Sequence, residues 1–247
     1  LDQFHLKSAL EPIWHSKADT ARKATNRLSI ILRHAAAQNL KVDVSILENA
    51  KALLGKRDAK SKNIPAMPWK AVPKFYASLA ERTVSNVALK FLILNPGARS
   101  KPVRYLNESH IVGNVWKIPG DLMKGTKGKE KDWRTPLTPE SLQLLEQLGP
   151  FVRHGNYFPN ASGRGVMSDA TMSRMMERMR LEYRPHGFRA SFRTWAEENG
   201  KDRGLAELCL AHKFYGDVEA AYIRTDKLEQ RRALMQDWSN FVTSKNS

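Results

Sequence analysis

Six residues in this chain are candidates for holding or attacking a phosphate. They lie in four short stretches and are of four side-chain types, arginine, lysine, histidine and tyrosine. The six are Arg99, Lys124, His186, Arg189, His212 and Tyr222. Guanidinium groups donate paired hydrogen bonds to an anion in a fixed fork, and imidazole takes or gives a proton near neutral pH. A phenol is a nucleophile once a base removes its proton. These side-chain types are suited to chemistry on a phosphate ester.

Each stretch also has an ordinary structural interpretation when it is taken alone. Arg99 suits a helix end that bonds to carbonyls, and the lysines from Lys124 onwards suit a solvated loop. A His-x-x-Arg tetrapeptide such as His186 to Arg189 occurs by chance in many helices. Tyr222 suits an amphipathic core position. The order and spacing of the four stretches therefore carry more information than any one of them.

In this order the stretches resemble the tyrosine recombinase family, most closely the integrases of prophages and genomic islands. The family pattern is an arginine after the second catalytic helix, a hairpin lysine, a His-x-x-Arg box, a Leu-Gly/Ala-His box and a tyrosine nine or ten residues further on. The most specific matches are Ala220-Ala-Tyr-Ile-Arg and Gln230-Arg-Arg-Ala-Leu-Met-Gln-Asp-Trp. Trp14-His-Ser-Lys-Ala-Asp-Thr-Ala resembles the family's core-binding domain. The resemblance covers essentially the whole chain.

The resemblance implies a role for each candidate. Arg99, Arg189 and His212 would donate to the nonbridging oxygens of a DNA phosphate, where charge develops during attack. Tyr222 would attack the phosphorus and become joined to the 3′-phosphate, with His186 in the acid-base role.

A lysine of the hairpin loop would protonate the leaving 5′-oxygen. Lys124 matches best because it follows the strand and Leu122-Met123, and the same loop holds three more lysines as alternatives, Lys127, Lys129 and Lys131. No cofactor is expected. The one cysteine, Cys209, lies three residues before His212, but a metal site there lacks third and fourth ligands.

One position departs from the family pattern. The family commonly has an acidic residue three positions after the first arginine, and here Arg99 is followed at that position by Pro102. That acid normally braces the site, so its absence weakens the expected support of Arg99.

Composition favours a polyanionic partner. The chain has 247 residues, with 41 Lys and Arg against 25 Asp and Glu, a formal net charge of +16. Residues 1–63 hold 12 basic and 6 acidic groups, and the remainder holds 29 and 19, so both parts are basic. Because hydrophobic residues are spread through both parts, the charge belongs to folded domains rather than to a tail. No apolar run is long enough for a membrane span, and one cysteine excludes an internal disulfide.

The pattern of apolar residues predicts a mainly α fold with a small antiparallel sheet. Residues 1–63 are expected to form a helical bundle with helices at 3–14, 16–39 and 44–54, where Ser16 and Asp19 resemble a capping box. A basic linker is expected at about 55–68. The resemblance implies that residues 1–63 are the core-type DNA-binding domain and residues 64–247 the catalytic domain.

The catalytic domain is expected to combine one hairpin with many helices. Residues 109–112 and 115–118 predict a hairpin around Gly113-Asn114, with 133–137 as a third strand. Predicted helices cover 69–81, 83–94, 139–148, 168–180, 187–199, 203–211 and 225–242. Most aromatic residues have core spacing. Trp238 and Phe241, on the last helix, are expected to dock on a neighbouring subunit, as this segment does in relatives.

The expected function is site-specific DNA recombination through a 3′-phosphotyrosine, which integrates or excises a mobile element. Alternatives are DNA relaxation like that of a type IB topoisomerase, and a decayed integrase that only binds DNA. The resemblance implies attachment sites in double-stranded DNA, assembly as a tetramer on DNA, and accessory DNA-bending or directionality factors. It also implies a cytoplasmic, nucleoid-associated protein of a bacterium.

Overall fold

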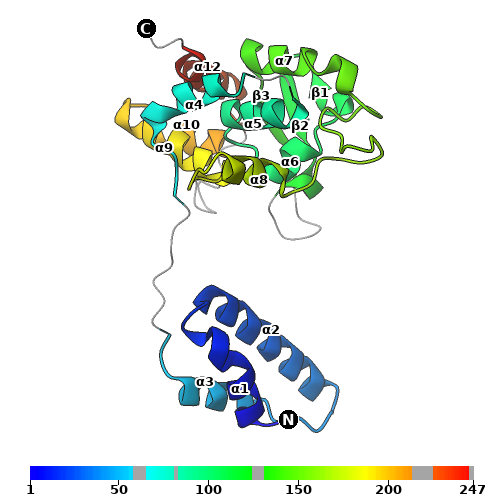
Figure 1. Ribbon diagram of the computed structural model, residues 1–247, viewed down its shortest axis with the longest axis vertical. Coiled ribbons are helices and arrows are strands. Elements are labelled where there is room, and N and C mark those ends of the chain that lie inside the picture. Colours follow the sequence, from blue (N-terminus) through cyan, green and yellow to red (C-terminus); the bar gives the residue numbers. More distant parts are fainter. Residues whose placement is uncertain (58–64, 81–82, 124–130, 213–224, 245–247) are drawn as a thin grey trace. The chain divides into compact units, whose positions relative to one another are not determined.

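The chain forms two compact units, Leu1–Asn63 and Ile64–Ser247. The computed structural model (Figure 1) describes residues 1–57, 65–80, 83–123, 131–212 and 225–244. Helices dominate both units, and one small antiparallel sheet lies in the second. The predicted fold class is confirmed.

The first unit is a bundle of three helices, α1 (Gln3–Trp14), α2 (Ala18–Ala37) and α3 (Ile46–Leu54). Asp2 caps α1 by accepting from the amides of Phe4 and His5. In α1 the buried apolar residues recur every four residues, and each helix turns one apolar face inward. That core consists of Leu6, Leu10, Trp14, Ala21, Leu32, Ile46, Leu47 and Ala50.

The start of α2 differs from the sequence prediction. Ser16 does not cap the helix, because its hydroxyl donates to the carbonyl of Pro12 at 2.8 Å. Asp19 instead pairs with Arg22 and Lys23 at 2.8 and 2.6 Å. The capping box was therefore wrong, since the turn that ends α1 takes up the serine hydroxyl.

The second unit holds the sheet and the remaining helices. Its α-helices are α4 (Val72–Ser78), α5 (Val84–Leu94), α6 (Ser100–Arg104), α7 (Pro139–Glu146), α8 (Thr171–Arg178), α9 (Phe188–Glu198), α10 (Arg203–Cys209) and α12 (Leu228–Thr243). Single 3₁₀ turns are η1 (Trp69–Ala71), η2 (Glu108–His110), η3 (Gly120–Leu122), η4 (Gly149–Phe151) and η5 (Pro185–Gly187). Thr83 and Thr138 cap α5 and α7 with their side chains.

The sheet has the order β1 (Ile111–Val112), β2 (Val115–Ile118), β3 (Trp133–Pro136), all antiparallel. The predicted turn is confirmed, with Val112 opposite Val115 and Gly113 at a positive φ of 57°. Trp116 and Ile118 point into the core, whereas Lys117 between them is exposed and pairs with Asp132. This alternation is that of a sheet with one covered face.

Helix α12 packs within its own unit, across α4 and α10 (Figure 1). Trp238 is fully buried and donates to the carbonyl of Ile93 at 2.8 Å. Phe241 contacts Trp238 and Trp69 with ring centroids 5.7 and 5.3 Å apart. Trp238 completes the core beneath α12, which contradicts its expected docking on a neighbouring subunit, whereas Phe241 is partly buried and its docking stays a prediction.

Within the described ranges, the structure holds no helix with the length and hydropathy needed to cross a bilayer.

Candidate active site

Arg99 is placed by the sharp end of α5. The helix stops at Asn95, whose buried amide donates to Phe91 O and to the hydroxyl of Ser141 in α7. The chain then turns through Pro96 and Gly97, and Arg99 becomes the N-cap residue of α6. Burial lowers the pKa of Arg99. Its guanidinium is half-buried, which leaves part of it open to an incoming anion.

Arg189 lies at the start of α9 and is only 5% exposed. Its Nη1 donates to Pro96 O at 2.6 Å and to Gly97 O at 2.9 Å, and its Nη2 donates to Leu210 O at 2.6 Å. One guanidinium thus ties the turn before Arg99 to the end of α10. Burial lowers the pKa of Arg189 to about 10, helped by the charge of Arg99 and opposed by Glu207. The group keeps its positive charge at neutral pH.

His212 completes this cluster. Its Nε2 lies 2.7 Å from Arg189 Nη2, and its Nδ1 lies 2.7 Å from Oε2 of Glu207. The other oxygen of Glu207 accepts from Nε of Arg193 at 2.7 Å. Burial would raise the pKa of Glu207, but the hydrogen bonds from His212 and Arg193 outweigh it and lower that pKa. Arg189 and His212 are therefore brought together as the sequence predicted.

Gly97 permits this arrangement. A Cβ on Gly97 would collide with the backbone carbonyl oxygen of Cys209, at the end of α10. Because the buried Cys209 cannot retreat without moving α10, only glycine fits this close approach.

Replacing Gly97 with alanine should lower the free energy of unfolding by about 1–3 kcal/mol, the range typical of an overpacked core. Urea denaturation measures this loss. Gly149→Ala is the matched control, because a Cβ there meets nothing within 4 Å. Equal midpoints for the two variants would contradict the steric argument.

His186 is at the entrance to α9. It lies in η5 with its side chain exposed, while its neighbours Pro185 and Gly187 are buried. Gly187 packs against the backbone of Pro65 and Ala66, which a Cβ would approach to 3.0–3.1 Å. His186 thus stands on a fixed turn, three residues before Arg189.

Lys124 and Tyr222 lie outside the described residues, and so do Lys127 and Lys129, whereas Lys131 is described and exposed. Described contacts fix the chain on either side. Lys101 Nζ donates to Asp121 O at 2.7 Å, just before the lysine loop. After the tyrosine, Asp226 accepts two bonds from Arg134 of β3, at 2.9 and 2.7 Å.

A buried arginine strengthens the attachment of Asp226 to β3. Arg231 is 1% exposed, donates to Asp226 O and Arg134 O at 2.7 Å each, and lies over the ring of Trp133 at 4.6 Å. The chain segment that follows Tyr222 is therefore held to the strand that follows the lysine loop.

Sequence reasoning missed Glu207 and Arg193. Their signal is spacing: Arg193 lies one helical turn after Arg189, and Glu207 lies five residues before His212. Cys209 and His212 do not act as a pair, since the Cys209 thiol is buried against Arg231 O. Burial raises the pKa of that thiol to about 12.

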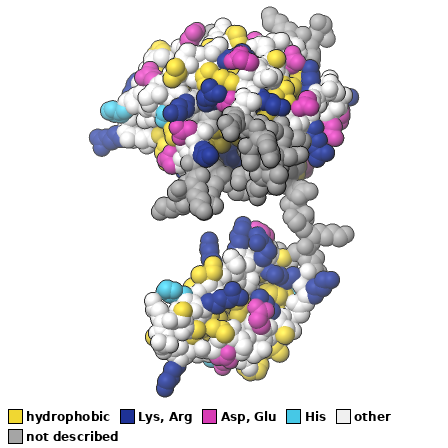
Figure 2. All heavy atoms as spheres, turned by 180° about the vertical axis from the view of Figure 1, so that it is seen from behind, with side chains coloured by type: hydrophobic (Ala, Val, Ile, Leu, Met, Phe, Trp, Pro, Cys, Tyr) yellow, Lys and Arg dark blue, Asp and Glu magenta, His cyan; other side chains and the backbone are white. Residues whose placement is uncertain are grey.

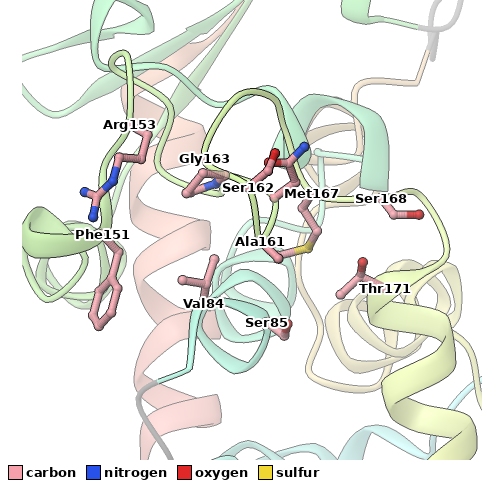
Figure 3. Close-up of a pocket in the computed structure, with 12 residues that line it drawn as sticks. Val84, Ser85, Phe151, Arg153, Ala161, Ser162, Gly163, Met167, Ser168 and Thr171 are labelled. Atoms are coloured by element: carbon pink, nitrogen blue, oxygen red, sulfur yellow. The ribbon is translucent and has the colours of Figure 1, made fainter.

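A cavity of about 580 Å³ lies elsewhere, between the 159–168 loop and the first turns of α5 and α8. Figure 3 shows Ser162, Gly163 and Met167 of this loop above Val84 and Ser85. None of the four candidates that the structure describes, Arg99, His186, Arg189 and His212, lines it. On the face that Figure 2 shows, Lys and Arg side chains are scattered over both units with acidic groups among them.

Comparison with known proteins gives relatives of one kind, although no family model matches the chain. The integrase of Enterobacteria phage P4 is 29% identical over 262 aligned residues, which cover 96% of this chain and 58% of that protein. The chain thus spans less than two thirds of that relative's length.

Solved structures share the fold. A lambda integrase fragment, solved as a dimer bound to a COC′ core site, superposes with a TM-score of 0.62 at 19% identity, covering 92% of this chain and 81% of the fragment. Lambda integrase solved as a tetramer bound to a Holliday junction gives a TM-score of 0.61 at 17% identity, covering 89% and 67%.

Proposed function

We propose that this chain, which belongs to the tyrosine recombinase family, cuts and rejoins DNA strands at specific sites through a 3′-phosphotyrosine intermediate. The observation that carries the proposal is the cluster of Arg99, Arg189 and His212, which the fold assembles from three separate segments. Buried carbonyls orient Arg189, and Glu207 orients His212. Two fixed guanidinium cations with an imidazole beside them suit the charge that develops on a phosphate under attack.

The substrate in this proposal is double-stranded DNA. A net charge of +16, shared by both units, supports binding to a backbone of phosphates. The helical unit, residues 1–63, would grip the core of an attachment site, and residues 64–247 would carry out the chemistry. Lambda integrase, whose fold this chain shares, was solved on a core site.

The cleavage step needs one nucleophile, one base and one acid. The Tyr222 oxygen would form a bond to phosphorus while the bond to the 5′-oxygen breaks, and the base His186 would take the phenolic proton. A lysine of the 124–131 loop, with Lys124 preferred, would give a proton to the departing 5′-oxygen. Arg99, Arg189 and His212 would bind the nonbridging oxygens. Attack by a 5′-hydroxyl on the phosphotyrosine reverses these steps and rejoins the DNA.

Integration or excision of a mobile element is the biological outcome that we propose. The phage P4 relative is named an integrase, and lambda integrase forms a tetramer on a Holliday junction. We infer a tetramer on DNA for this chain too, assisted by DNA-bending or directionality factors, in association with a bacterial nucleoid.

The test is a suicide DNA substrate that is nicked next to the scissile phosphate, so that cleavage releases a short fragment and traps the enzyme. The chain should form a denaturant-resistant, protease-sensitive DNA adduct in the presence of EDTA. Strand transfer to a second attachment site then separates recombination from simple relaxation. Tight binding to a verified site without any adduct would overturn the proposal.

A further inference from the structure

Arg189 has almost no donor capacity left for a ligand. A guanidinium carries two hydrogens on each Nη and one on Nε. Both Nη1 hydrogens go to Pro96 O and Gly97 O, and the two on Nη2 go to Leu210 O and to His212. Of the five guanidinium hydrogens of Arg189, only the one on Nε has no acceptor among the described residues. An incoming phosphate that takes two hydrogen bonds from Arg189, one from Nε and one from Nη2, must therefore compete with His212 for Nη2.

The same contact fixes the protonation of His212. A guanidinium cannot accept a hydrogen bond, so Nε2 of His212 accepts from Arg189 and carries no proton. The single ring proton is then on Nδ1, which donates to Glu207 Oε2 at 2.7 Å. In this state the ring is neutral and has no N–H to offer an anion.

Donation to a phosphate requires a second proton on the ring. The cation in contact with the ring is Arg189 on α9. Arg193 on the same helix contacts Glu207, and Arg99 before α6 interacts electrostatically with Arg189. The carboxylate of Glu207 on α10 is the anion in contact with the ring, and its side chain is only 19% exposed. Because Arg193 shares this carboxylate, Glu207 is held in place whichever form His212 adopts.

We propose that Glu207 is a positioning residue for DNA cleavage: it holds His212 by Nδ1 and supplies the negative charge that allows Nε2 to gain a proton and donate to the scissile phosphate. Phosphate binding then breaks the contact between Arg189 and His212, frees one Nη2 hydrogen and takes up one proton. The inference rests on the proposed function, and it names an acid that the sequence pattern did not single out.

Glu207→Gln tests the charge, because the amide oxygen keeps an acceptor for Nδ1. Single-turnover adduct formation on the suicide substrate should fall by about 10- to 100-fold at pH 7.5, with little change in DNA affinity. The variant lacks the negative charge that favours the doubly protonated ring of His212. As the pH rises, the variant should therefore lose activity at a lower pH than the native chain. Glu207→Asp should recover part of the rate.

Glu197→Gln is the matched control. Glu197 also pairs with Arg193, at 3.2 Å, but it is exposed and makes no contact with His212. This variant should cleave at the native rate. Two outcomes for Glu207→Gln would show that Glu207 does not act as proposed. The first is a native cleavage rate with a native pH profile. The second is a loss of activity with an unchanged pH profile and a lower melting temperature.

A second measurement does not depend on cleavage. Ring ¹⁵N shifts of His212 should show the Nδ1–H form in the free chain. With DNA bound at pH 7 they should show a doubly protonated ring in the native chain and a singly protonated ring in Glu207→Gln. A ring protonated on Nε2 in the free chain would overturn the proposal even if the chain cleaved no DNA. If the ¹⁵N shifts are as expected but no DNA adduct forms, the result would count against the proposed function and not against the role of Glu207.

Discussion

Replacing Tyr222 with phenylalanine should abolish the covalent DNA adduct altogether. The substitution removes one oxygen, the atom that would form the bond to phosphorus, and keeps the aromatic ring. Because no other residue is proposed as the nucleophile, the residual rate should fall below detection. The measurement is the denaturing gel assay on the nicked substrate, with DNA binding followed by mobility shift.

The control separates chemistry from binding. Tyr222→Phe should bind the attachment site within about twofold of the native chain, because the phosphate-binding groups remain. A parallel Tyr215→Phe variant changes the other tyrosine of the same 213–224 segment and should leave the adduct intact. An adduct of full yield with Tyr222→Phe would exclude this residue as the nucleophile.

Replacing Arg189 with methionine should cost both stability and activity. The apolar side chain fills similar space but leaves the carbonyls of Pro96, Gly97 and Leu210 without their donor. Each buried acceptor that loses its partner costs about 1–3 kcal/mol, so we expect the free energy of unfolding to fall by about 3 kcal/mol or more. Cleavage should fall by at least about 1000-fold, since a fixed cation is also lost.

Denaturant titration and adduct formation measure the two effects separately. Cleavage is compared at a temperature where circular dichroism shows the variant to be folded. Arg203→Met, at the exposed start of α10, serves as the control and should match the native chain in both assays. Adduct formation within about tenfold of native in Arg189→Met would show that this guanidinium is structural only.

Local signals in the sequence were enough to predict most elements. The Gly113-Asn114 turn between alternating strands predicted the hairpin, and the helix predicted at 83–94 is found as α5 (Val84–Leu94). Helix α6 was missed because Pro102 stands inside it. That proline occupies the first turn, where its lack of an N–H costs nothing, so a short helix forms regardless.

The site was less predictable than the fold. Order and spacing singled out Arg189 and His212, and the structure places them 2.7 Å apart. Glu207 was missed because its five-residue spacing from His212 gains meaning only from the way α9 and α10 pack together. Burial of Trp238 was missed for the same reason, since the sequence of α12 shows an apolar stripe but not what covers it.

Two separate cores give the chain two cooperative folding units. Each unit has its own hydrophobic cluster, so melting one does not by itself expose the other. The first unit has only 63 residues, a size at which stability is marginal. Calorimetry should therefore resolve an early transition for the helical bundle and a later one for the unit that holds Arg189. At temperatures between the two transitions, the cleavage unit would be folded but the helical bundle, its proposed partner in DNA binding, would be unfolded. Recombination activity should therefore be lost at a lower temperature than the one at which the site unfolds.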